Sequence, residues 1–170
     1  MNAYFFPMIS RLAANPVIEK LPTLMATVPT QETMSPNQDY LVLDTNIVLD
    51  LFYWRDARVQ GLMQALSSKT LYALVSLETL AELTDVLMRA PFDRSEDQTR
   101  DILTAYLALS CQVSDTDSVS PVRCKDVDDQ KFLDLAVRRV CPLITRDKHL
   151  LKIAKKMRRL GVRITTPEGL

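Results

Sequence analysis

The chain has 170 residues, of which 47% are hydrophobic and 25% charged, and its 21 basic residues balance 21 acidic ones. This length and composition predict one globular domain with a sizeable core, and they exclude a chain that is disordered throughout. Three glycines are too few for a phosphate-binding glycine loop or a dinucleotide fingerprint, and a single histidine excludes a paired-histidine zinc site.

Cysteine usage and hydropathy indicate the compartment. The three cysteines are odd in number and lack CxxC spacing, so we expect neither a disulfide framework nor a zinc knuckle. No stretch approaches 18 consecutive apolar residues, and no basic residue precedes Arg11, which is atypical of a secretory signal peptide. We therefore expect a cytoplasmic protein without a membrane partner.

The first 38 residues differ in composition from the rest. Prolines recur there every six to nine residues, and the stretch PTQETMSPNQ is polar and turn-forming. This pattern predicts a mostly irregular N-terminal arm over residues 1–38, followed by the main domain over 39–170. Apolar residues near the beginning of the arm indicate that it docks on another surface: Phe5, Phe6, Met8, Ile9 and Leu12.

From residue 39 onward, short apolar segments alternate with stretches of helical periodicity. Ser76 and Ser95 stand where helix N-caps are expected, and LLKIAKKMRRL (150–160) is predicted to be helical. The alternation predicts an α/β fold with a parallel sheet covered on both faces. The predicted strands are residues 40–44, 71–75, 111–113, 142–145 and 162–165.

Four acidic residues follow these predicted strands. Asp44 closes the first strand, and Glu82 lies two turns into the helix after the second. Asp129 opens the helix after a long loop, and Asp147 follows the fourth strand. Because functional groups gather at the carboxyl ends of parallel strands, we expect the four carboxylates to lie close together.

Carboxylates in one pocket repel one another, and a divalent cation removes that penalty. A set of oxygen ligands without histidine or cysteine selects a hard ion, Mg²⁺ or Mn²⁺. Such an ion polarises a phosphoryl oxygen and supplies a hydroxide-like nucleophile near neutral pH. The pattern therefore indicates hydrolysis of a phosphate ester.

Each acid taken alone has a simpler explanation. Asp44, Asp129 and Asp147 stand at positions typical of helix N-caps, and an isolated helical glutamate such as Glu82 is usually solvated. It is their joint placement that favours a metal site.

Five segments of the chain resemble, in order and spacing, the PIN-domain ribonucleases. The resemblance covers residues 40–170 and is closest to the branch of VapC-like toxin components of toxin–antitoxin pairs. The segments are VLDTNIVL (42–49), VSLETLAELTDVLMRAPF (75–92), KDVDDQKFLDLA (125–136), LITRDKHLL (143–151) and GVRITTPEGL (161–170).

The resemblance implies an α/β/α sandwich around a mostly parallel sheet, and a Mg²⁺- or Mn²⁺-dependent endoribonuclease that hydrolyses RNA phosphodiesters. It also implies an antitoxin protein as partner, and homodimers are common in the family. Carried over by motif, the catalytic metal ligands are Asp44, Glu82, Asp129 and Asp147, and the auxiliary residues are Asn46, Asp126 and Thr145. Asp128 competes with Asp129 for the third position.

Basic residues concentrate near the C-terminus. Residues 138–163 hold ten basic groups with Asp147 as the only acid, which favours contact with RNA phosphates over helix ends that are merely solvated. Arg146 and Lys148 flank Asp147 and are the expected RNA-binding residues. Tyr53 and Trp54 either stack on a base or complete a core or dimer surface.

Other acidic α/β domains match less well. Haloacid-dehalogenase-type phosphatases have Asp-x-Asp after the first strand, whereas this chain has Asp44-Thr45-Asn46, and response-regulator receivers need a lysine that VRITTPEGL lacks. A non-catalytic PIN-fold module that binds RNA or protein is the alternative from a different class.

Overall fold

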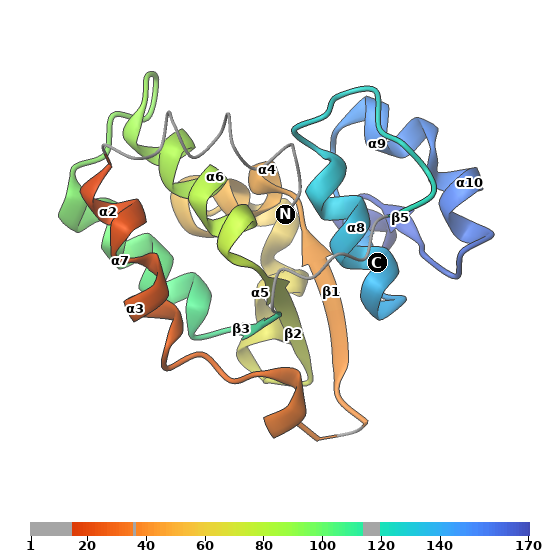
Figure 1. Cartoon of the computed structure of the whole chain (residues 1–170), viewed down its shortest axis with the longest axis horizontal. Helices are drawn as coiled ribbons and strands as arrows, with labels where there is room; N and C mark the ends of the chain where they lie inside the picture. The colour runs from red at the N-terminus through yellow and green to blue at the C-terminus, as the bar shows by residue number, and fades with distance from the viewer. Residues whose placement is uncertain (1–14, 36, 114–119) are drawn as a thin grey trace.

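The computed structural model describes residues 15–35, 37–113 and 120–170, and these contain one five-stranded sheet (Figure 1). The spatial order is β3-β2-β1-β4-β5, and every neighbouring pair is parallel. The predicted parallel sheet is thus confirmed. The strands are β1 (Asp39–Leu43), β2 (Leu71–Val75), β3 (Ser110–Gln112), β4 (Leu143–Ile144) and β5 (Ile164–Thr165).

Both faces of the sheet are buried because side chains of a strand alternate between them. On β1, Leu41 and Leu43 belong to one hydrophobic core, whereas Tyr40 and Val42 belong to the other. Strand β2 repeats this alternation. Two separate cores therefore lie on either side of the sheet.

Helices cover both faces and make the predicted α/β/α sandwich. Helices α2 to α7 pack on one core and α8 to α10 on the other, as the two sides of Figure 1 show. No helix among the described residues is long and apolar enough to cross a membrane. The helices are α2 (Pro16–Glu19), α3 (Leu21–Met25), α4 (Thr45–Leu49), α5 (Gln60–Ser67), α6 (Leu77–Met88), α7 (Glu96–Leu107), α8 (Gln130–Arg139), α9 (Lys148–Lys152) and α10 (Ala154–Arg158). Short turns complete them: a π-helical turn η2 (Asp50–Trp54) and the 3₁₀ turns η1 (Gln31–Thr33), η3 (Ala57–Val59) and η4 (Pro167–Gly169).

Local signals fix the helix ends. Ser76 exchanges hydrogen bonds with Thr79, and Ser95 with Gln98, so both predicted N-caps are confirmed as capping boxes. The helical segment expected over 150–160 consists of two short helices, α9 and α10, which are separated at Ile153. The Ile153 amide donates to the carbonyl of Leu150, three residues back, which tightens the turn and ends α9.

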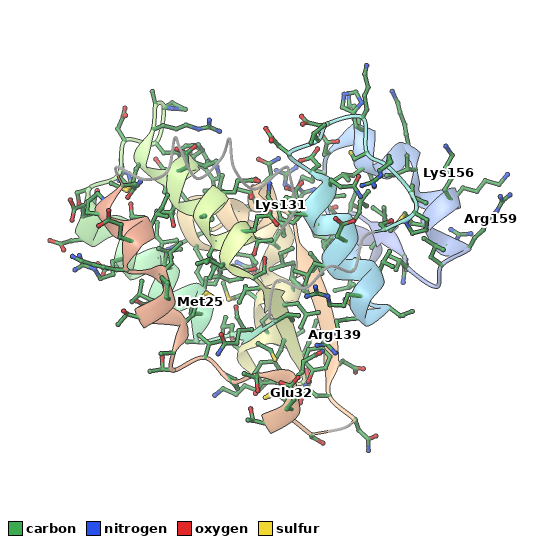
Figure 2. All side chains as sticks on the ribbon, viewed as in Figure 1. Met25, Glu32, Lys131, Arg139, Lys156 and Arg159 are labelled. Atoms are coloured by element: carbon green, nitrogen blue, oxygen red, sulfur yellow. The ribbon has the colours of Figure 1, made fainter. Side chains whose placement is uncertain are left out.

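The described part of the N-terminal arm is more ordered than expected. Pro16 and Pro22 lie in the first turns of α2 and α3, where the missing N–H of proline costs no hydrogen bond, instead of interrupting regular structure. The two helices pack on α6 and α7, and Met25 points toward the core (Figure 2). The boundary at residue 38 remains a prediction, and the apolar residues Phe5 to Leu12 lie outside the described residues.

The arm also protects one edge of the sheet. The backbone amide of Gln112 on β3 donates to the carbonyl of Pro29 at 2.9 Å, and its side chain donates to Val28 at 2.7 Å. An uncovered parallel edge would offer these groups to other chains. The segment that follows α3 therefore closes the sheet next to β3.

Substitution of the arm tests its share in stability. Leu21 is fully buried, so Leu21→Ala should lower the free energy of unfolding by about 2–4 kcal/mol. The exposed Thr23→Ala on the same helix should change it by less than about 0.5 kcal/mol. Urea denaturation measures both, and equal values would contradict the packing described here.

Candidate active site

Asp44 is the most buried of the four predicted acids, with 3% of its surface exposed. It follows β1 and occupies the N-cap position of α4, yet its side chain makes no capping hydrogen bond. Instead, Thr145 Oγ1 donates to Asp44 Oδ2 at 2.6 Å. The carboxylate is therefore oriented by Thr145, the residue that follows β4.

Thr145 joins Asp44 to Asp147. While its hydroxyl donates to Asp44, the same oxygen accepts the backbone amide of Asp147 at 2.9 Å. Asp147 Oδ1 accepts the amides of His149 and Leu150 at 2.6 and 3.0 Å, so the N-cap interpretation holds for this residue. Because Thr145 is fully buried, this arrangement fixes both acids at the carboxyl end of the sheet.

Glu82 points from α6 into the same region and is bound by two donors. Thr45 Oγ1 donates to Glu82 Oε1 at 2.6 Å, and Lys131 Nζ forms an ion pair with Glu82 Oε2. The Glu82 side chain is 21% exposed, which excludes the freely solvated glutamate that an isolated helix position suggests.

Lys131 is a site residue that sequence analysis missed. It lies on α8 with its side chain only 5% exposed, and Figure 2 shows it between α8 and α6. Its ammonium also donates to the backbone carbonyl of Asp128. The sequence did contain a signal for it: Lys131 directly precedes Phe132 and lies on the face of α8 whose other residues are apolar.

Asp129 begins α8 and makes no side-chain capping bond. It is half-buried, whereas Asp126 and Asp128 are exposed and form a local turn in which the Asp128 amide donates to Asp126 Oδ1 at 3.0 Å. The placement favours Asp129 over Asp128 as the third acid.

The pKa values show that the acids share one electrostatic field. Burial raises the pKa of Asp44 to about 6, and the negative charges of Glu82 and Asp147 add to this, while the bond from Thr145 opposes it. Burial raises the pKa of Asp129 to about 7, with Asp44 the first of several carboxylates that raise it further. Ionised carboxylates at this edge therefore lack sufficient positive charge around them.

The donor set fits a hard divalent cation in its chemistry. All four candidate ligands are carboxylates, and their mutual repulsion is the penalty that such an ion relieves. Among the described residues, no group of three or more histidine, cysteine, aspartate or glutamate side chains is close enough to hold a metal. Lys131 already balances the charge of Glu82. Asp44 and Asp129, whose pKa values are raised, are therefore the acids that a bound cation would stabilise most.

Three of the remaining predicted residues, Asn46, Arg146 and Lys148, line an open pocket of about 440 Å³ beside Asp147. Asn46 and Lys148 are exposed and line it together with Asp147. Arg146 also lines it, but its Nε donates to Asp50 at 3.0 Å and its Nη1 to Glu168 at 2.5 Å, so both carboxylates already compensate its charge. Figure 2 shows two further basic residues, Lys156 on α10 and Arg159 directly after it.

Removal of the buried ammonium of Lys131 should lower the stability of the folded protein. Lys131→Met leaves Glu82 partly buried without its counter-charge, and we expect a loss of about 2–3 kcal/mol in the free energy of unfolding. The double variant Lys131→Met with Glu82→Gln should recover at least half of this loss. If the single variant is as stable as the wild type, the ion pair has no structural role.

Comparison with known proteins identifies the family. The model of the PIN domain matches residues 40–149. A search of the curated proteins found no significant match. A chain in the crystal structure of VapBC2 from Rickettsia felis, bound to a DNA fragment from their promoter, matches with a TM-score of 0.53 and 14% sequence identity, over 74% of this chain and 96% of that chain. At this identity the likeness concerns the fold alone. Since the domain model spans well over half of the chain, the protein belongs to the PIN domain family.

Proposed function

We propose that the protein is a Mg²⁺- or Mn²⁺-dependent endoribonuclease that hydrolyses RNA phosphodiesters. One observation carries the proposal: acids from four separate segments, Asp44, Glu82, Asp129 and Asp147, act on one another at the carboxyl end of the sheet. Membership of the PIN domain family supports a nuclease, and the oxygen-only set supports a metal as its cofactor.

Asp44 and Asp129 would hold the cation, with Glu82 and Asp147 completing its surroundings. When bound, Mg²⁺ or Mn²⁺ supplies Lewis-acid polarisation of a phosphoryl oxygen and lowers the pKa of water. Thr145 keeps the Asp44 carboxylate in one orientation, and Thr45 and Lys131 do the same for Glu82. Such fixed donors need not reorganise during the reaction, which is how preorganised sites stabilise developing charge.

The substrate would approach from the open pocket. Asn46 lies at its surface, beside the buried Asp44, and can donate a hydrogen bond to the RNA backbone. Lys148 contributes an exposed ammonium there. Contacts of this kind bind phosphates with strong salt dependence and little sequence preference.

We further propose that the protein is the toxin of a toxin–antitoxin pair in the cytoplasm. The similarity of its fold to a chain of the VapBC2 structure supports this assignment. An antitoxin protein would then be its partner, and a homodimer is the assembly that the family resemblance implies.

Cleavage of total cellular RNA in the presence of Mn²⁺ tests the activity. Asp44→Asn should lower cleavage by roughly 100-fold or more, since residues that merely orient metal ligands are already worth about 10- to 100-fold. The matched control is Asp97→Asn, the same change at a side chain that is 86% exposed on α7, and it should cleave like the wild type.

Chelation of the metal should abolish cleavage by the wild type and by the control. Equal cleavage by Asp44→Asn and the wild type would contradict the assigned site. If neither cleaves any RNA, a non-catalytic binding module becomes the better interpretation of the fold.

Stability without metal gives a second test that does not depend on activity. Because the pKa of Asp129 is raised to about 7 in the folded protein, this carboxyl binds a proton there at pH values where it is ionised in the unfolded chain. Its contribution to stability therefore falls as pH rises from about 4 to 7. Above pH 7 the carboxyl is ionised in the folded protein too, and the cost of burying its charge is then fully present. At pH 8 in EDTA, Asp129→Asn should be about 1–2 kcal/mol more stable than the wild type.

Added Mg²⁺ should then stabilise the wild type more than Asp129→Asn. Urea denaturation at pH 8 and pH 5 measures the effect, and Asp97→Asn again serves as the control. A gain for Asp129→Asn that is as large at pH 5 as at pH 8 would contradict the electrostatic explanation.

A further inference from the structure

We propose that Trp54 forms a subsite for one unpaired nucleobase of a single-stranded RNA, next to the candidate catalytic residue Asp147. The proposal rests on the proposed function and deepens it, because it names the form of RNA that the site accepts and the residue that holds it. Three observations carry it: an exposed aromatic cluster, a pocket that this cluster shares with the candidate site, and the exposed ammonium of Lys148 at that pocket.

Trp54 presents an unusually large apolar surface to solvent, with 61% of its side chain exposed. It is not isolated, since its ring lies 4.6 Å from that of Tyr53 and 6.1 Å from that of Phe92, measured between centroids. The interplanar angles are 81° and 60°, so neither neighbour is stacked on the indole. Stacking is the contact that a flat aromatic ligand would add.

The cluster is held in place from behind. Tyr53 and Phe92 pack edge to face at 5.0 Å and 87°, and the guanidinium of Arg94 lies 5.4 Å from the centre of the Tyr53 ring. Arg94 Nε also donates to the carbonyl of Phe92 at 2.8 Å. Two chain segments far apart in sequence, around Tyr53 and Phe92, thus support the indole from one side.

Trp54 and Phe92 line the same pocket as Asn46 and Asp147. A ligand that stacks on the indole therefore lies next to two residues of the candidate active site. The pocket measures about 440 Å³ and is open, which is within the range of small-molecule sites. A nucleotide that flanks the phosphate to be cleaved meets these requirements.

A positive charge near Trp54 favours binding of the phosphate backbone next to the stacked nucleobase. Asp50 and Glu168 compensate Arg146, which leaves the exposed Lys148 to meet a phosphate at the pocket. An aromatic platform with a nearby cation is how proteins bind single strands without reading sequence. A duplex cannot occupy the subsite, because its bases are stacked on one another.

The indole itself reports the contact, because Trp54 is the only tryptophan in the chain. We would titrate the full-length protein with a single-stranded RNA decamer of mixed sequence, with Ca²⁺ in place of Mg²⁺, and check by gel that the RNA stays intact. The expected result is saturable quenching of tryptophan fluorescence. The same decamer annealed to its complement should not quench.

Two variants separate stacking from bulk. Trp54→Leu keeps an apolar side chain without a π-face and should weaken binding of a labelled decamer, measured by fluorescence anisotropy, about 5- to 100-fold. Trp54→Phe should lie within about 5-fold of the wild type. The salt dependence of affinity should not change in Trp54→Leu, whereas Lys148→Ala should reduce its slope by about one.

Equal affinities for Trp54→Leu, Trp54→Phe and the wild type would overturn the proposal. So would a change in sedimentation of Trp54→Leu with unchanged RNA affinity, because the aromatic cluster would then be a protein interface. Quenching by single-stranded RNA in a protein that cleaves none would support the subsite and reject the nuclease. Cleavage without quenching would support the nuclease and reject the subsite.

Discussion

The negative charge gathered at the carboxyl end of the sheet is the constraint around which the site is built. Asp44 is almost fully buried, and Glu82, Asp129 and Asp147 act on it or on one another. Folding must offset this repulsion. A hydroxyl on Asp44, and a hydroxyl with a buried ammonium on Glu82, satisfy these two acids, and Asp147 is stabilised by the amides at the start of α9. Asp129 receives no comparable partner from α8, and burial together with the neighbouring carboxylates raises its pKa.

The topology of the sheet explains why these residues meet. The central strand β1 lies between β2 and β4, so the segments that follow all three strands emerge at the same edge. Helix α6 then brings Glu82 back over this edge toward Lys131 on α8, from the opposite layer. The ion pair thus connects the two helical layers across the end of the sheet, where neither hydrophobic core reaches. One of the candidate acids, Glu82, thus also holds the two helical layers together.

Regions outside the acid set extend the site and the fold in different ways. The arm contributes two short helices to one core and covers the edge next to β3. The π-helical turn after α4 ends at Arg55, whose left-handed backbone (φ 50°) turns the chain directly after Trp54. Phe92 comes from the turn that follows α6 and packs against the rings of this segment. The aromatic surface and Asp147 therefore share one pocket although separate turns supply them.

Much of this could be predicted from the sequence, because the relevant signals are local. Apolar runs ending in Asp44 or Thr145, the caps at Ser76 and Ser95, and alternation of strand with helix determine the elements and place the acids after strands. Residue order along the chain could not show that Asp50 and Glu168 compensate Arg146, or that Lys131 reaches Glu82. Those contacts join residues dozens of positions apart or depend on which face of a helix becomes buried. Only the tertiary structure decides them, because burial and pairing arise when the layers pack together.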